Sequence, residues 1–215
     1  MSKNNNKESI FFISSLQKYV IASTLLSLTI ILELTFDNIG LPKIMTEVKI
    51  GSFFKISLIP LILIGFLLGF KYSLIFSLLY ACFHVLKAFL LKGYWGYMES
   101  MNFNLVYKLS SLLLDYFLVD MLYSLSGLLY LPNFLYLDNY KKIWTNLLMI
   151  FSLVFLVKCL ASYFLWAKYL PNNTNFILLC SCLSFNIIPV LINFLITGFS
   201  FCFLNPRIKI YLQNK

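Results

Sequence analysis

The stretch IPLILIGFLLGFKYSLIFSLLYACF, residues 59 to 83, decides the fold class of this chain. Its apolar residues follow one another without the alternation of a half-buried strand, and Lys71 is its only charged residue. In lipid every backbone amide must be bonded within the protein, so a continuous apolar run of this kind predicts helix. The short break at Gly69, Phe70 and Lys71 predicts two helices that turn back on each other as antiparallel neighbours.

The same apolar pattern runs through most of the chain. Of its 215 residues, 60% are hydrophobic and 12% are charged, whereas an ordinary soluble domain has about 25% charged residues. A bilayer span takes about twenty residues, so a chain of this length divides into several spans with short connections. We therefore predict an all-α integral membrane protein folded as a six-transmembrane-helix bundle. The predicted spans are residues 18–36, 55–70, 72–91, 105–131, 143–168 and 176–204.

Both ends of the chain are polar, and they set the predicted orientation. Residues 1–17 are predicted to be a polar cytoplasmic N-terminus, residues 18–204 the six-helix membrane domain, and residues 205–215 a basic cytoplasmic C-terminus. The distribution of Lys and Arg near the span ends favours cytoplasmic termini only weakly over the opposite orientation. We expect a multi-pass protein of the cell membrane with both termini cytoplasmic, and its longer, aromatic connections would face outside.

The remaining composition excludes several classes of function. The net charge of +9 comes from lysines scattered between apolar runs, which suits the anionic headgroups of a lipid bilayer better than nucleic acid. The five cysteines lie inside apolar runs, and no pair has the C-x-x-C spacing. Neither a nucleotide-binding loop nor a paired-carboxylate metal site appears. We therefore expect no enzyme activity, no cofactor and no metal, with any ATP hydrolysis in separate subunits.

Three ionisable residues inside the predicted spans need an explanation, because each costs about 2.5 to 3.5 kcal/mol at the middle of a bilayer. They are Asp115, Asp120 and Lys158. In one interpretation Lys158 pairs with Asp115 or Asp120 as a buried salt bridge between helices, which fixes packing and binds nothing. In the other, at least one of the three faces a water-filled pocket and contacts a substrate. His84, the only histidine, is expected to be a packing or interfacial residue.

Prolines and small residues add two local expectations. Pro60 and Pro189 lie within predicted spans, where the missing amide hydrogen is expected to kink the helix unless neighbours satisfy the freed carbonyl. On the first span, Ser23 and Ser27 form a small-xxx-small pair beside Ala22, a spacing that lets another helix approach closely. The kinks would border a cavity, and the small residues would face a neighbouring helix.

Three stretches of the chain resemble one known family, in compatible order. Residues 59–83 carry a Pro-containing helix, a Gly-x-Lys turn and a following Leu-Tyr pair. Residues 114–127, LDYFLVDMLYSLSG, carry an acidic-Tyr pair and a small-x-small-Gly ending. Residues 162–171, SYFLWAKYLP, and the pair of Phe185 and Asn186 follow. Together they resemble the substrate-binding S components of energy-coupling-factor (ECF) importers, most closely the thiamine-specific branch.

The resemblance implies a function and partners. An S component captures a vitamin or vitamin-like small molecule near the outer face of six helices, under the connection between the first two. It associates with a membrane scaffold subunit and two cytosolic ATPase subunits, which drive uptake. The substrate-binding residues carried over by position are Asp115, Tyr116, Lys158, Trp166 and Asn186, and the scaffold-docking residues are Ala22, Ser23 and Ser27.

Three positions differ from the thiamine branch. Asp115 stands in place of a longer Glu, Lys158 in place of a histidine, and Ser181 in place of a tyrosine. A cationic ring does not suit Lys158 unless an acid neutralises it, so an anionic or phosphate-bearing vitamin, or another ring compound, is open beside thiamine. The alternative to transport is a structural or assembly membrane protein in which an interhelical Asp–Lys pair only joins helices.

Overall fold

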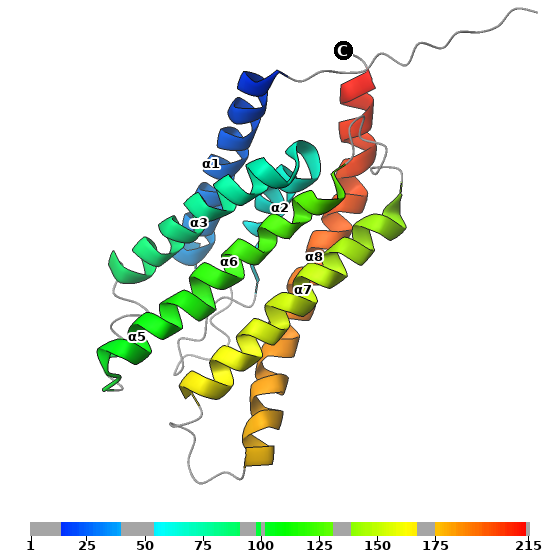
Figure 1. Cartoon of the computed structure of the whole chain (residues 1–215). Coiled ribbons are helices and arrows are strands. Elements are labelled where there is room, and N and C mark those ends of the chain that lie inside the picture. The colour runs from blue at the N-terminus through cyan, green and yellow to red at the C-terminus, as the bar shows by residue number, and fades with distance from the viewer. Residues whose placement is uncertain are drawn as a thin grey trace, which may run out of the picture.

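The computed structural model describes residues 14–39, 54–90, 98–99, 102–130, 139–166 and 175–213. All regular structure in these ranges is helical, as predicted (Figure 1). Four of the described helices are long and apolar enough to cross a membrane, namely Ser15–Phe36, Phe70–Leu90, Tyr140–Phe164 and Ile177–Ile208. The all-α class and a composition that suits a membrane are therefore confirmed, whereas the six crossings stay a prediction.

The described helices follow one another along the chain as α1 (Ser15–Ile39), α2 (Leu58–Leu68), α3 (Phe70–Leu90), α5 (Leu105–Ser111), η1 (Leu112–Leu118), α6 (Val119–Leu122), η2 (Tyr123–Leu129), α7 (Tyr140–Ala161), η4 (Ser162–Trp166) and α8 (Asn175–Gln213). The segments α5, η1, α6 and η2 form one unbroken helical run from residue 105 to residue 129. Within it, η1 is π-helical and η2 is a 3₁₀ helix. The winding of this run therefore changes where Asp115 and Tyr116 lie, since π-helical hydrogen bonds span five residues rather than four.

α2 is shorter than predicted. It has 11 residues, roughly 16 Å of helix, whereas the hydrocarbon core of a bilayer is about 30 Å thick. Pro60 stands in the first turn of α2, where its missing amide hydrogen takes no helical hydrogen bond away. The kink predicted at Pro60 is therefore wrong, because this proline begins a helix rather than bending one.

α2 occupies the middle of the bundle. It contacts α1, α3, η2 and α8, and nine of its 11 residues are buried. The predicted turn is confirmed at Gly69, whose φ of 91° lies in the left-handed region that glycine tolerates. α2 and α3 therefore lie against each other in opposite directions.

The other helices run up and down around α2 (Figure 1). The start of α1, the α2–α3 turn, the start of α7 and the end of α8 lie at one end of the molecule. The ends of α1, α3 and α7 lie at the opposite end, together with the starts of α5 and α8. We call this opposite end the distal end. It is the end at which the predicted outer connections would lie.

α8 passes through the boundary that was predicted at residue 205. It has 39 residues, about 58 Å of helix, which exceeds the thickness of a bilayer core. Pro189 lies inside α8, and Asn193 Nδ2 donates a hydrogen bond of 2.7 Å to its carbonyl oxygen. The Asn193 side chain of the next turn thus bonds the proline's own carbonyl, whereas the carbonyl that Pro189 leaves without an amide partner is that of Phe185, four residues earlier.

Small residues let α2 and η2 approach closely. A Cβ atom added to Gly127 would lie 2.5 Å from the backbone N and Cα of Phe70, and one added to Gly65 would lie 2.6 Å from the Gly127 backbone N. Ser73 and Ser126 face each other near the same contact, with their hydroxyl oxygens 3.3 Å apart. Close approach through small residues is typical of helix contacts in membranes.

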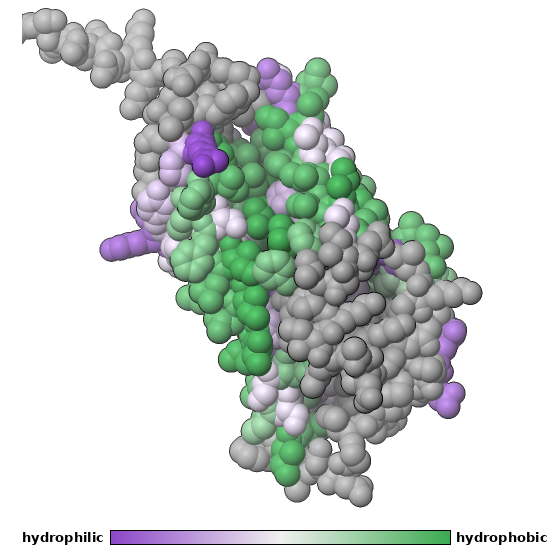
Figure 2. Space-filling model, turned by 180° about the vertical axis from the view of Figure 1, so that it is seen from behind, coloured by the Kyte–Doolittle hydropathy of each residue, from purple (hydrophilic) through white to green (hydrophobic). Residues whose placement is uncertain are grey.

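The surface of the described bundle is largely apolar. Large hydrophobic side chains are exposed on most of the long helices, and Leu16 and Phe203 are each 74% exposed. The face shown in Figure 2 is mostly green where it is not grey, and its strongly purple residues lie toward its edges. Such a surface suits lipid as the surrounding solvent.

We expect Gly127→Ala to destabilise the protein, because the added methyl group would collide with the backbone of Gly69 and Phe70. Over-packing of this kind costs about 1–3 kcal/mol. The unfolding temperature of the purified protein in detergent measures the effect. Leu128→Ala, at the neighbouring position, which is 53% exposed, is the control and should lower that temperature less. An equal loss in both variants would contradict the close contact.

Candidate functional site

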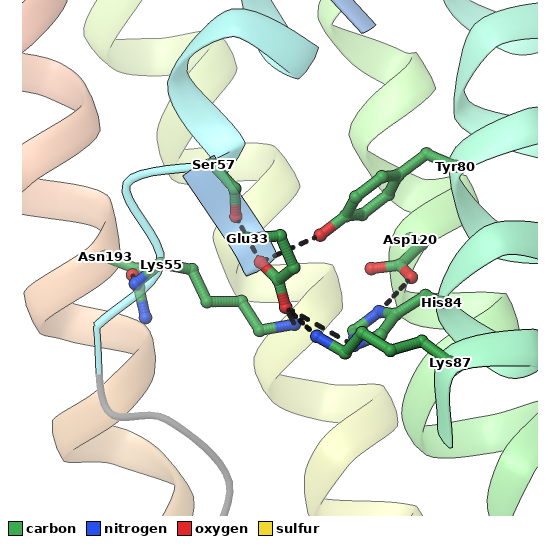
Figure 3. Close-up of polar contacts among 8 residues, drawn as sticks. All are labelled: Glu33, Lys55, Ser57, Tyr80, His84, Lys87, Asp120 and Asn193. Atoms are coloured by element: carbon green, nitrogen blue, oxygen red, sulfur yellow. Dashed lines mark hydrogen bonds and ion pairs between the residues drawn. The ribbon is translucent and has the colours of Figure 1, made fainter. Parts of the chain in front are cut away.

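A buried carboxylate lies toward the distal end of α1. Glu33 is 6% exposed, and its Oε2 accepts hydrogen bonds from Ser57 Oγ at 2.5 Å and from Tyr80 Oη at 3.2 Å. Its Oε1 lies 2.9 Å from the Lys87 ammonium and 4.0 Å from the Lys55 ammonium. Figure 3 shows these side chains converging on Glu33. One carboxylate therefore joins α1, the residues before α2, and α3.

His84 extends these contacts to the helical run from residue 105 to residue 129. Its Nδ1 lies 2.7 Å from Asp120 Oδ2, and its Nε2 lies 3.7 Å from Glu33 Oε1. The ring of Tyr116 packs edge-on against the imidazole, with ring centroids 4.6 Å apart. His84 and Asp120 are both buried, so the imidazole is enclosed between two carboxylates.

We call seven of these side chains the polar network. They are Glu33, Lys55, Ser57, Tyr80, His84, Lys87 and Asp120. A charge buried in a low-dielectric interior is costly unless it is paired and hydrogen-bonded, and removing one partner of such a pair costs about 3–5 kcal/mol. The polar network therefore helps to fix which faces of α1, α3 and α6 meet.

Lys55 connects the polar network to α8. Its backbone N–H donates a hydrogen bond of 2.7 Å to Asn193 Oδ1, while its side chain extends toward Glu33 (Figure 3). Because Asn193 also bonds the Pro189 carbonyl, this one amide side chain holds two segments of backbone. Lys55, Pro189 and Asn193 all line a cavity.

This cavity is small, with a volume of about 30 Å³. It is lined by Lys55, Asp115, Val119, Tyr123, Phe151, Val154, Lys158, Pro189, Val190 and Asn193. One buried water molecule needs about 10–15 Å³ by the same measure, whereas ligands of drug size occupy pockets of about 300 Å³ or more. The cavity therefore has room for one or two water molecules and is smaller than a vitamin.

Two of the predicted substrate-binding residues, Asp115 and Lys158, line this cavity. Asp115 Oδ2 accepts a hydrogen bond of 3.2 Å from Ser111 Oγ. No carboxylate of a described residue lies within 4.0 Å of the Lys158 ammonium. Asp120 is bonded to His84 instead of Lys158. The structure thus brings Asp115 and Lys158 to one cavity without joining them in a salt bridge.

The other predicted substrate-binding residues lie away from the cavity, or their side chains lie outside the described residues. Tyr116 packs on the polar network and is not among the described residues that line the cavity. Asn186 Nδ2 donates to Ser162 Oγ at 2.8 Å and to the Cys182 carbonyl oxygen at 2.9 Å, which fixes α8 against the end of α7. Trp166 ends η4, and its side chain lies outside the described residues.

The predicted scaffold-docking residues divide between the core and the surface. Ala22 is fully buried in the hydrophobic core, so it cannot face a partner. Ser23 and Ser27 are exposed on α1, about one helical turn apart. Of the predicted patch, these two serines alone are open to another helix.

Glu33, Lys55, His84 and Lys87 are candidates that the predicted site left out. Two signals in the sequence pointed to them. Glu33 is the only acidic residue in the first predicted span, where an ionisable group needs a partner. Tyr80, His84 and Lys87 recur at i, i+4 and i+7, which puts them on one face of α3.

No protein-family model matches the sequence, and neither a curated protein nor a solved structure matches it. The residues and geometry of the site are therefore the basis for its function.

The polar network predicts strong coupling between Glu33 and Lys87. Glu33→Gln should destabilise the folded protein by about 3–5 kcal/mol, because the partly buried ammonium groups of Lys55 and Lys87 lose their counter-charge. Lys87→Met should also destabilise, and the double variant should recover part of the loss in a double-mutant cycle of unfolding free energies.

The control for this cycle is Glu99→Gln. Its carboxylate is 58% exposed and lies 3.6 Å from Lys108, so its loss should cost less than about 1 kcal/mol. Strictly additive losses at Glu33 and Lys87 would contradict the coupling.

Proposed function

We propose that this protein is the substrate-binding S component of an ECF importer, and that it captures a vitamin or vitamin-like small molecule. The observation that carries the proposal is the cavity lined by both Asp115 and Lys158. Ionisable groups are costly inside a membrane bundle, and those that face a cavity commonly mark a substrate path. The resemblance of the chain to this family selects the same two residues.

The position of the cavity supports binding from outside the cell. Lys158 stands near the distal end of α7, and Asp115 lies in the distal half of the run from residue 105 to residue 129. With both termini cytoplasmic, a ligand would reach these residues from outside. The connection between α1 and α2 would cover it, and Lys55, at the end of that connection, is already held by Glu33 and Asn193.

Six crossings fit the proposal. The run from residue 105 to residue 129 would be about 37 Å long as a regular α-helix, enough for one crossing. α2 is too short to cross alone, but its neighbours enclose it, so it need not meet lipid along its length. A bundle of this kind would open between α7, α8 and η1 to enlarge the cavity for a ligand.

The proposed protein has no enzyme activity and depends on partners. Two cytosolic ATPase subunits would drive uptake, and a membrane scaffold subunit would join them to the bundle. The exposed pair Ser23 and Ser27 supports docking through α1, because small side chains allow close helix approach.

The second candidate is a structural or assembly membrane protein. The enclosed polar network favours it, because these side chains partner one another between helices and need no ligand. The two candidates differ at the cavity, since a purely structural protein gains nothing from Asp115 and Lys158 lining it. Ligand binding therefore decides between them.

Lys158→Ala and Asp115→Asn should each weaken ligand binding by about tenfold or more, because each removes a charge from a poorly solvated site. Native mass spectrometry with small-molecule extraction, on protein purified in mild detergent from cells grown in rich medium, identifies the ligand. Titration of the emptied protein then gives the affinity of each variant.

The control for these variants is Lys141→Ala, which removes an exposed lysine from the same helix as Lys158. It should bind the ligand as the unaltered protein does. The proposal fails if no vitamin-sized compound is bound, or if both cavity variants keep full affinity.

Replacing both Ser23 and Ser27 by Leu should block assembly with the scaffold subunit and leave ligand binding unchanged. The larger side chains would keep another helix from approaching α1. Co-purification of the scaffold and ATPase subunits measures assembly. Ser152→Leu, at an exposed position of α7, is the control. Full assembly of the double variant would place the docking surface elsewhere.

A further inference from the structure

We propose that the end of the bundle opposite the distal end, here called the proximal end, is a docking surface for anionic lipid headgroups. The start of α1, the α2–α3 turn, the start of α7 and the end of α8 lie there (Figure 1). Each of these segments brings at least one cation to the proximal end. We call these cations the basic collar, and they are Lys18, Lys71, Lys141, Lys142 and Arg207. The proposal does not depend on the transport function, and each stands without the other.

The basic collar has no acidic counterpart among the described residues. No carboxylate of a described residue lies within 4.0 Å of any of its cations. Lys18 is half-buried, and the other four side chains are exposed. The described acidic side chains lie in the distal part of the bundle, and they are Glu33, Glu99, Asp115 and Asp120. Within the described part of the protein, the proximal end thus carries positive charge alone.

The basic collar lies at the depth expected of lipid headgroups. On α1 the next charged residue after Lys18 is Glu33, and on α7 the next after Lys142 is Lys158. Each interval holds roughly 22 Å of uncharged helix. Residues 175–206 of α8, which precede Arg207, are uncharged as well. Because the hydrocarbon core of a bilayer is about 30 Å thick, such stretches suit hydrocarbon, and the basic collar stands where headgroups begin.

Aromatic side chains lie beside the basic collar. Tyr19 and Tyr140 are 42% and 44% exposed at the starts of α1 and α7. Lys18 Nζ lies 5.8 Å from the centroid of the Tyr72 ring, and this ring packs edge-on against Tyr19 with centroids 5.1 Å apart. Tyr side chains concentrate at the headgroup level of membrane proteins, and a ring face attracts an ammonium group. The proximal end thus combines the aromatic and cationic residues that contact headgroups.

An anionic lipid suits this surface better than a zwitterionic one. The phosphate of a zwitterionic lipid is accompanied by a cation of the same headgroup. The phosphate of phosphatidylglycerol has no such cation, so lysine and arginine can neutralise it through charge-assisted hydrogen bonds. Anionic lipids also give the cytoplasmic leaflet its negative potential. A basic collar on that leaflet agrees with the predicted cytoplasmic termini.

The test compares two lipids with the same acyl chains, dioleoyl phosphatidylglycerol and dioleoyl phosphatidylcholine. Native mass spectrometry of the full-length protein in an uncharged detergent measures the affinity of each. We expect the anionic lipid to bind about tenfold or more tightly, since each cation near an anionic surface contributes about fivefold. The preference should fall in about 0.5 M NaCl, because salt screens exposed charges. Equal binding of the two lipids would overturn the proposal.

Variants assign the lipid preference to the basic collar. Combining Lys18→Gln, Lys71→Gln, Lys142→Gln and Arg207→Gln should reduce the preference to less than about threefold. Replacing the same three lysines by Arg keeps the charge and should keep the preference. Lys108→Gln, which removes a lysine near the distal end, is the control and should also keep it. A combined Gln variant that retained the full preference would overturn the proposal, as would its loss in Lys108→Gln.

The acidic surface of a cytosolic protein is the other class of occupant that would suit the basic collar. Equal binding of the two lipids, together with loss of co-purified cytosolic subunits in the combined Gln variant, would assign the basic collar to such a protein. That result would overturn the proposal.

Discussion

The arrangement of the helices depends on one carboxylate held away from water. Lipid gives helices no hydrophobic reason to associate, so packing and polar contacts decide which faces meet. Glu33 supplies such a contact. One of its oxygens accepts a hydrogen bond from Ser57, which precedes α2, and the other forms an ion pair with Lys87 of α3. Through His84 the same charge approaches Asp120, so that α1, α3, α6 and the residues before α2 share one buried electrostatic arrangement.

Local patterns were enough to predict the fold class and the turn between α2 and α3. Continuous apolar runs predict helix wherever they lie in lipid, and Gly69 is the residue that a reversal with positive φ needs. The start of α2 was not predictable in the same way. Pro60 is compatible with a kink in a long helix and with the first turn of a short one, and only the packing of the residues before it decides.

In the candidate site, too, the sequence predicted some residues and missed the contacts of others. Asp115 and Lys158 could be predicted because the cost of a charge in lipid is visible in one residue at a time. The partners of Glu33 could not, since Lys87 is 54 residues away in the chain. Such a pairing depends on how each helix is rotated about its axis, and nearly uniform hydropathy says little about rotation. Asn186, predicted from its position alone, instead joins α7 to α8.

The helical run from residue 105 to residue 129 contacts several neighbours at once, because its residues point to different sides. On a regular α-helix, residues five apart such as Asp115 and Asp120 would point about 140° apart. Asp115 lines the cavity together with Val119 and Tyr123, whereas Asp120 contacts His84 of α3. The same helical run therefore places Asp115 at the cavity, Asp120 against His84 and Gly127 against α2.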